Sequence, residues 1–486
     1  MTTVTVLCCV ALYMCSLPCL AYLQGKSYHI TEYFTVLKSR YFLLIVLLQF
    51  AFAVLFALNC LWAGVICVCV TLPLGIVFAV KIAKSNKPMK FTFRMIRTSV
   101  ALCCVITAVC LVFPVGVALL PFAVAFSHIV LLPLESAIGR YYISKARKKL
   151  HASNVVTIAV TGSFGKTSVK QILSQLLNCN ATPSSYNTPL GIARYINGNA
   201  IDSRYIVLEF GARRRGDISK LCRLFPPDVG VITGVTDQHL ETFKSLDNIV
   251  YEKGCLIDSL TESSFCVIGS VQNTESYRTR GKCRKVYVGT DGLSFDIVKV
   301  ENNEMHFVVH GDNDADFQCP LLGVANVQNI VCALEVCRQL GYDISQFKDS
   351  VKGLLQIDHR MQLINTPHFD IIDDSYNANI NGVASCCTTL DMLRGAKVAI
   401  SQGIVEGGSQ QRQLNVQCGR LLGASCRLVV VVGVNSNSIA EGVALAGGNV
   451  VFADSTADAV KTVNALDYKV DYLLFQNDIP EDCTKI

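Results

Sequence analysis

The sequence predicts an N-terminal α-helical membrane region followed by an α/β protein of two domains, and two observations support this. Apolar residues dominate the first 135 or so positions, whereas the remainder has the composition of an ordinary α/β protein. In that remainder, short β-branched runs alternate with segments of helical periodicity. Charged residues make up 16% of the 486 residues, below the roughly 25% of a soluble domain. We place the membrane region at 1–140 and the two α/β domains at 150–357 and 358–486.

Five apolar runs in the first region are each close to the roughly 20 residues that cross a bilayer as a helix. They cover about 4–22, 42–60, 61–82, 99–115 and 117–134. Two alternatives stay open. The first run is a cleaved signal peptide, although no basic segment precedes it, or the last two runs form one re-entrant pair.

Basic residues cluster between and after these runs, at 23–41, 81–97 and 140–149. Positively charged loops face the cytoplasm. We therefore expect a multi-pass protein of the inner (plasma) membrane, with its N-terminus outside and both α/β domains cytoplasmic. The formal net charge of +6 then reflects membrane topology and not nucleic-acid binding.

A phosphate-binding loop is predicted where a β-branched strand at 155–160 meets a helix. The strand runs into TGSFGKTS at 161–168, and apolar residues at helical spacing follow. The glycines let backbone N–H groups approach phosphate oxygens, and the helix N-terminus adds partial positive charge. Lys166 would reach the β- and γ-phosphates, and the Thr167 hydroxyl would bind Mg²⁺. Because Val160 stands where the longer Walker pattern has glycine, a plain strand–turn–helix is the alternative.

Two more predicted strands end in metal-binding residue types. The strand from Tyr205 leads into Glu209, and the strand at 229–233 is followed by His239. Ligands bind at the carboxyl ends of strands in open α/β sheets, so both side chains are candidate Mg²⁺ ligands. A histidine taken alone is more often structural.

Seven motifs occur in a fixed order after residue 155. They are TGSFGKTS (161–168), LEFGA (208–212), HLETFKSL (239–246), EKG (252–254), NVQN (326–329), DHR (358–360) and DDSYNAN (373–379). Together they resemble the Mur ligase family, and its MurF-like branch in particular, over about 155–486. Strands at 397–400, 428–432 and 450–453 fit the second, Rossmann-like domain that this resemblance implies beside a central ATP-binding domain.

The resemblance implies an ATP-dependent ligase that joins a carboxylate to an amine through an acyl phosphate, with ATP and Mg²⁺ as cofactors. The expected substrates are a cell-wall peptide precursor, either soluble or lipid-linked, and an amino-acid or dipeptide amine. One alternative is a ligase of amino-acid or polyglutamate type, or an amidating enzyme. Another is a membrane-bound scaffold that binds a nucleotide without catalysis.

The family's site residues transfer position by position. The catalytic candidates are Lys166, His239, Lys253 and Arg360. The candidates for ATP binding are Thr161, Gly162, Ser163, Phe164, Gly165, Lys166, Thr167, Ser168, Asn326, Asn329, Arg360 and Asp374. The Mg²⁺ candidates are Thr167, Glu209 and His239, and the substrate candidates are Asn187, Thr188, Tyr376 and Asn377. Lys253 matches a lysine that is carbamylated in many relatives; a solvated lysine is the alternative there, and a plain turn is the alternative for the loop at 186–191.

Overall fold

The computed structural model describes residues 2–25, 28–34, 89–112, 120–183, 186–236, 240–376, 379–405 and 410–477, and five isolated positions between 69 and 80. The chain forms two compact units, Met1–Tyr141 and Tyr142–Ile486. Each unit has its own core and is described by itself.

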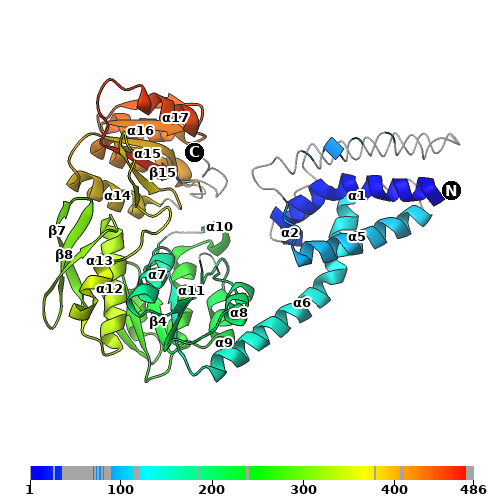
Figure 1. Ribbon diagram of the computed structural model, residues 1–486, viewed down its shortest axis with the longest axis horizontal. Coiled ribbons are helices and arrows are strands. Elements are labelled where there is room, and N and C mark those ends of the chain that lie inside the picture. Colours follow the sequence, from blue (N-terminus) through cyan, green and yellow to red (C-terminus); the bar gives the residue numbers. More distant parts are fainter. Residues whose placement is uncertain are drawn as a thin grey trace. The chain divides into compact units, whose positions relative to one another are not determined.

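The first unit is helical (Figure 1). Its elements are α1 (Thr2–Gly25), α2 (Ile30–Tyr33), α5 (Phe93–Val112) and the first part of α6 (Leu120–Ala152). Leu20 of α1, Leu102 of α5 and Val124 of α6 are fully buried in one cluster. The Tyr33 hydroxyl donates to the carbonyl of Pro121 over 2.9 Å. These helices therefore pack on one another through apolar side chains.

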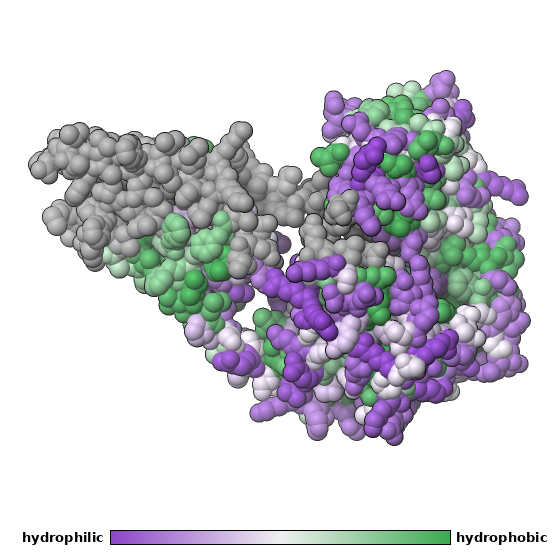
Figure 2. All heavy atoms as spheres, turned by 180° about the vertical axis from the view of Figure 1, so that it is seen from behind, coloured by the Kyte–Doolittle hydropathy of each residue, from purple (hydrophilic) through white to green (hydrophobic). Residues whose placement is uncertain are grey.

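Part of the membrane prediction falls on described residues. The helix Pro121–Ala152 is the one described helix that is long and apolar enough to cross a membrane, judged by length and composition. The predicted spans at 42–60 and 61–82 lie outside the described residues, apart from isolated positions. Figure 2 shows hydrophobic side chains gathered on the coloured part of the first unit. The number of spans stays a prediction.

The second unit contains a central six-stranded sheet with the order β2-β3-β1-β4-β5-β6. Each neighbouring pair of its strands is parallel. The strands are β1 (Val156–Thr161), β2 (Asn180–Ala181), β3 (Tyr205–Glu209), β4 (Val229–Ile232), β5 (Phe265–Ile268) and β6 (Arg284–Tyr287). The predicted strands at 155–160, 205–212 and 229–233 are therefore confirmed.

Helices cover both faces of this sheet (Figure 1). Helices α7 (Lys166–Leu176) and α12 (Val324–Gln339) pack on one face, where Ile158 and Val160 point. On the other face, which Ala159 reaches, lie α8 (Pro189–Gly198), α9 (Asp217–Leu224) and α11 (Leu246–Asp258). Because both faces are covered, the strands read as continuous apolar runs without alternation.

A three-stranded antiparallel sheet follows, and the sequence analysis did not predict it. It consists of β7 (Ser294–Glu301), β8 (Glu304–His310) and β9 (Ala315–Cys319). Residues of β8 alternate strictly between buried and partly exposed positions, the pattern of a sheet with one wet face. Short elements complete this region: α10 (Leu240–Phe243), η3 (Glu275–Thr279), η4 (Ile344–Phe347) and α13 (Lys348–Lys352).

The last part of the chain forms a second six-stranded sheet with the order β10-β11-β15-β12-β13-β14. Only its edge strand β10 is antiparallel to its neighbour. The strands are β10 (Gln362–Ile364), β11 (Asp370–Asp374), β12 (Lys397–Gly403), β13 (Leu428–Val432), β14 (Val450–Ala453) and β15 (Tyr472–Asn477). The helices are α14 (Ile380–Met392), α15 (Gln411–Ser425), α16 (Ser436–Leu445) and α17 (Thr456–Asn464). The α/β architecture predicted for this region is confirmed.

Candidate active site

The loop between β1 and α7 is shaped by two glycines. Gly165 has φ +72°, and a Cβ there would lie 2.5 Å from Oδ1 of Asn329. A Cβ on Gly162, at φ +150°, would overlap the Thr233 hydroxyl at the end of β4. Larger residues at either position would push the loop away from its neighbours. The two glycines therefore let the loop pack closely on its neighbours at the N-terminus of α7, where a phosphate is favoured.

The loop is also held from the side of β4. The backbone N–H of Ser163 donates to the carbonyl of Gly234 over 2.8 Å, and its hydroxyl bonds to the backbone of Thr236 over 3.1 Å. Phe164 packs against Gly234, which has no side chain to obstruct the ring. These contacts give Ser163 and Phe164 a supporting role within the predicted nucleotide loop.

The ammonium of Lys166 lies over the loop. It donates to the carbonyls of Gly162 and Ser163 over 2.9 and 3.1 Å. Burial lowers the pKa of Lys166 to about 8; Glu209 opposes this shift and Arg360 adds to it. Lys166 therefore interacts electrostatically with Glu209 of the first α/β domain and with Arg360 of the second.

The carboxylate of Glu209, at the end of β3, accepts hydrogen bonds from three side chains of the site. Its Oε2 accepts from the Thr167 hydroxyl and from Nζ of Lys170, each over 3.0 Å. Its Oε1 accepts from Nδ2 of Asn187 over 3.3 Å. Burial alone would raise the pKa of Glu209, but Lys170 and Lys166 hold it below its usual value. Glu209 is thus a buried carboxylate kept ionised by two lysines.

The oxygens of Thr167 and Glu209 suit Mg²⁺. This ion is usually bound through one or two carboxylates together with waters and substrate phosphates. The two side chains directly follow the phosphate-binding loop and a neighbouring strand, so a nucleotide phosphate on the loop would lie beside them. No group of three or more His, Cys, Asp or Glu side chains that could hold a metal ion occurs within the described ranges. The residues present therefore fit an ion shared with phosphate.

Lys253 on α11 is buried, at 3% exposure. Burial lowers its pKa to about 7; Lys166 adds to this shift, while Glu252, Asp217 and Glu209 oppose it. Its amine therefore lies near the charges of the loop and of Glu209. The solvated lysine that the sequence left open is wrong, because the side chain is removed from water.

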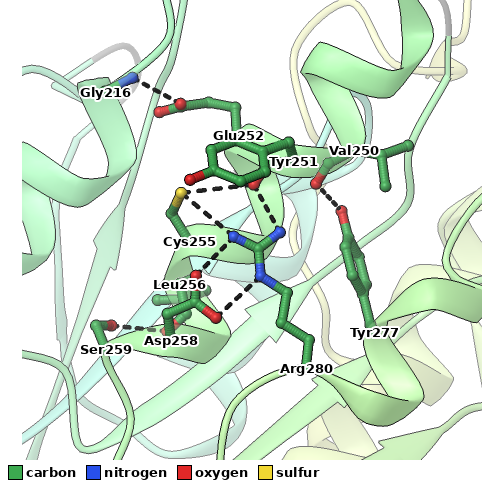
Figure 3. Close-up of polar contacts among 10 residues, drawn as sticks. All are labelled: Gly216, Val250, Tyr251, Glu252, Cys255, Leu256, Asp258, Ser259, Tyr277 and Arg280. Carbon is green, nitrogen blue, oxygen red and sulfur yellow. Dashed lines mark hydrogen bonds and ion pairs between the residues drawn. The ribbon is translucent and has the colours of Figure 1, made fainter.

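The two neighbours of Lys253 explain the rest of the EKG motif. Glu252 accepts from the backbone N–H groups of Gly216 and Ile218, each over 2.7 Å, and so caps the N-terminus of α9 (Figure 3). Gly254 leaves room for the guanidinium of Arg280, which a Cβ would overlap. The motif thus fixes α11 on both sides and holds Lys253 in place.

The turn that carries Arg360 is conformationally unusual. His359 and Met361, on either side of it, have φ +60° and +51°, a region that non-glycine residues rarely adopt. Two carboxylates at the end of β11 hold the turn. Nδ1 of His359 lies 2.7 Å from Oδ2 of Asp373, and the backbone N–H of Met361 donates to Oδ1 of Asp374 over 3.3 Å.

Arg360 is also held by its side chain and its carbonyl. Its guanidinium lies 4.5 Å from the ring centroid of Tyr376. Nδ2 of Asn326, at the start of α12, donates to its carbonyl over 3.3 Å. Burial raises the pKa of Asp374 to about 6, and the nearby Arg360 opposes that shift. The predicted residues Asn326, Arg360, Asp374 and Tyr376 therefore belong to one cluster.

The other predicted residues take different places. Thr188 caps the N-terminus of α8 by accepting from the N–H of Gly191, which gives it a structural role. Asn329 lies against the loop at Gly165. His239 and Asn377 lie outside the described residues, so their assignments stay predictions.

Two residues of the site escaped the sequence analysis. Lys170 is buried and pairs with Glu209, and Glu252 caps α9. A signal for Lys170 exists, because a lysine three residues after Thr167 lies on the same face of the helix and interrupts its buried apolar positions. Glu252 gives no local signal, since its partners lie more than 30 residues away in the chain.

The chain matches known protein families over both α/β regions. Residues 160–337 match the model of the Mur ligase middle domain, and residues 359–475 match the Mur ligase, glutamate ligase domain. Together the two matches cover more than half of the chain. The chain belongs to the Mur ligase family. The predicted family membership is therefore confirmed.

Similar curated proteins are named UDP-N-acetylmuramoyl-tripeptide--D-alanyl-D-alanine ligase. The Escherichia coli protein is 27% identical over 315 residues, which cover 62% of this chain and 69% of the relative. The Haemophilus influenzae protein is 26% identical over 254 residues, 50% of this chain and 55% of the relative. This Mur ligase chain thus spans between about half and two thirds of the relatives it matches.

Solved structures show the same fold. MurF from Acinetobacter baumannii superimposes with a TM-score of 0.64 at 21% identity, covering 70% of this chain and 77% of that one. MurF from Thermotoga maritima in complex with ADP gives a TM-score of 0.63 at 24% identity, covering 70% and 80%. The Mur ligase fold of the second unit is thereby confirmed.

Proposed function

We propose that this Mur ligase is an ATP- and Mg²⁺-dependent amide ligase. It joins a carboxylate of a peptidoglycan-precursor peptide to the amine of an amino acid or dipeptide. The observation that carries the proposal is the convergence on Glu209: the loop threonine, a buried lysine and Asn187 all contact one ionised carboxylate. Relatives named UDP-N-acetylmuramoyl-tripeptide--D-alanyl-D-alanine ligase favour D-alanyl-D-alanine as the amine and a muramoyl tripeptide as the carboxylate.

The proposed reaction has two steps. The substrate carboxylate attacks the γ-phosphorus of ATP, the bond to ADP breaks, and an acyl phosphate forms. The amine then attacks the acyl carbon, phosphate leaves, and the amine loses a proton as the amide forms. Such transfers depend mainly on positioning and on neutralising charge. Mg²⁺, held by Thr167 and Glu209, would offset the phosphate charge.

The chain's own residues supply the remaining positive charge. Lys166 lies on the phosphate loop. Arg360 comes from the second Mur domain and interacts electrostatically with Lys166 and Glu209. Asp374, at the end of β11, would accept from a ribose hydroxyl, as the family resemblance implies. Asn187 of the loop at 186–191 donates a hydrogen bond to Glu209. The loop that carries two substrate candidates therefore contacts a candidate Mg²⁺ ligand.

We further propose that residues 1–140 hold the enzyme at the cytoplasmic face of the inner membrane, with several spans and an external N-terminus. Large apolar side chains on α5 and α6 support this, because they are exposed. They include Phe93, Ile96, Val100, Phe122, Phe126 and Val130. A membrane anchor would raise the local concentration of a lipid-linked precursor.

The test is release of ADP and phosphate by the full-length protein. We expect release only when a muramoyl tripeptide precursor and D-alanyl-D-alanine are both present. Lys166→Ala should abolish it, whereas Lys220→Ala, at an exposed position on α9, should not. If wild type and Lys166→Ala both bind nucleotide but release no ADP with any precursor, the scaffold alternative is favoured and the ligase proposal is wrong.

The same assay separates the substrate alternatives. A lipid-linked precursor should be used faster than its soluble nucleotide-linked form in protein reconstituted into vesicles. Equal rates with both forms would contradict the lipid-linked proposal. Turnover with glutamate and a polyglutamate acceptor, and none with muramoyl peptides, would move the enzyme to the amino-acid ligase class.

A further inference from the structure

A polar cluster lies inside the first unit, which the ligase chemistry does not use. We call Tyr28, Arg94, Arg97, His128 and Glu135 the Arg94 cluster. Nε of Arg97 donates to Oε1 of Glu135 over 2.6 Å, and Nε of Arg94 lies 4.0 Å from Oε2 of the same carboxylate. The guanidinium of Arg94 lies 4.0 Å from the ring centroid of Tyr28. Nε2 of His128 lies 3.2 Å from the carbonyl of Tyr28.

Three polar atoms of this cluster are buried and have no hydrogen-bond partner in the part of the chain that the structure describes. They are the Tyr28 hydroxyl, Nε of Arg94 and Nδ1 of His128. The His128 side chain is almost completely enclosed, at 1% exposure. Buried polar atoms are nearly always paired, because leaving them unpaired costs the full desolvation penalty. Three such atoms on residues in mutual contact indicate a missing ligand.

The charge of the cluster selects the ligand. Arg94 and Arg97 lie in the first turns of α5, which has no acidic residue in its first turn. Cations at this end of a helix are unfavourable, because the helix dipole already makes it positive. Glu135 offsets one of the two guanidinium charges. An anion would offset the other, and arginine binds phosphate through paired N–H groups.

The position of the cluster along the chain indicates which kind of molecule supplies that anion. The apolar part of α6 runs from Leu120 to Leu134 and ends at Glu135, and the apolar part of α5 begins after Arg97. His128 lies within the apolar part of α6, whereas Arg94, Arg97 and Glu135 lie where two apolar helices meet their polar ends. In a membrane this is the level of the lipid head groups, where arginine side chains reach phosphate. Phe93, beside the cluster, is 82% exposed, as suits a side chain in contact with lipid.

We infer that the Arg94 cluster binds the phosphate group of an anionic membrane lipid. The guanidinium of Arg94 and the Tyr28 hydroxyl donate to the phosphate oxygens. The inference rests on the proposed placement of residues 1–140 in a membrane, and it does not depend on the ligase reaction.

The test measures lipid binding to the full-length protein in detergent by native mass spectrometry. Phosphatidic acid and phosphatidylcholine are titrated separately. We expect one tightly retained phosphatidic acid and weak retention of phosphatidylcholine. Arg94→Gln should weaken phosphatidic acid binding about tenfold, as expected for the loss of a charge-assisted hydrogen bond. Arg140→Gln, an exposed arginine further along α6, should leave it unchanged.

A second variant guards against a simple folding defect. Glu135→Gln removes the competing carboxylate, so it should strengthen phosphatidic acid binding, whereas a general loss of structure would weaken it. Equal binding by wild type and Arg94→Gln, or equal weakening by Arg140→Gln, would overturn the inference. So would displacement of the lipid by inorganic phosphate at matched concentration, which would assign the cluster to a soluble anion. None of these outcomes changes the result expected in the ADP-release assay, so the ligase proposal is tested separately.

Discussion

The ammonium of Lys170 lies 3.0 Å from Oε2 of Glu209, in an ion pair whose side chains are only 1% and 3% exposed. The same oxygen accepts from the Thr167 hydroxyl. A Mg²⁺ ion bound by Thr167 and Glu209 must therefore share the carboxylate with an existing cation. The pair keeps Glu209 ionised before the metal arrives.

Lys170→Met should make stability depend on the metal. Removing Lys170 takes away the cation that pairs directly with the buried carboxylate, which costs about 3 kcal/mol of unfolding free energy. Mg²⁺ with ATP would then replace the missing charge. We expect a larger rise in the thermal unfolding midpoint on adding Mg²⁺·ATP to the variant than to wild type. Lys220→Met serves as the exposed control; an equal rise in all three proteins would contradict this role.

The effects of substitutions at Gly254 and Arg280 on the free energy of unfolding should not be additive. Arg280 donates to both oxygens of Asp258 and to the carbonyl of Tyr251 across the face of α11 (Figure 3). A Cβ at Gly254 would overlap the guanidinium, so Gly254→Ala should cost about 1–3 kcal/mol through overpacking.

Denaturant unfolding of the double variant tests this coupling. In an Arg280→Ala background only the overlap with the Tyr277 ring remains, so the cost of Gly254→Ala should fall by about 1 kcal/mol or more. Gly198→Ala, where no atom lies within 4 Å of the added Cβ, should not destabilise in either background. Additive costs at 254 and 280 would show that the two residues act independently.

The phosphate loop and the strand ends were predictable because their signals are local. A parallel strand buried on both faces must be an apolar run, and a glycine loop before a helix is a local pattern that favours phosphate. Glu209 followed from its place at the end of such a strand. Each of these inferences needs only a few neighbouring residues.

Other parts of the site depend on contacts between distant residues. Lys170 meets Glu209 across 39 positions, and Glu252 meets Gly216 across 36. No local pattern gives such pairings. The sheet of β7, β8 and β9 was not predicted although β8 alternates, because none of the seven motifs falls within it. His239, a candidate Mg²⁺ ligand, lies outside the described residues, so its role still rests on the resemblance.

Arg360→Lys should reduce turnover although it keeps the charge. The guanidinium stacks on Tyr376, and a lysine supplies neither the planar face nor the paired N–H groups. We expect ADP release to fall about tenfold or more, as for the loss of a charge-assisted contact. Tyr376→Leu, which removes the stack alone, should have a smaller effect. A lysine variant with wild-type turnover would show that only the charge matters at this position.

Lys253→Met should raise stability while it lowers activity. Burial lowers the folded-state pKa of Lys253 to about 7, whereas an unfolded lysine titrates near roughly 10.4. Between these values the unfolded chain binds more protons, so this group makes wild-type stability rise with pH. Below about pH 7 the amine is charged in both states, and the full cost of burying it applies.

Thermal unfolding in CO₂-free buffer measures the effect, since a neutral amine can react with CO₂ to give the carbamate that the family resemblance implies. The unfolding midpoint of Lys253→Met should exceed that of wild type most at about pH 6, and the gap should narrow toward roughly pH 10. ADP release should drop in the same variant, because the amine lies near the charges of Lys166 and Glu209. A gap that does not change with pH would mean that Lys253 is not buried as a titrating amine.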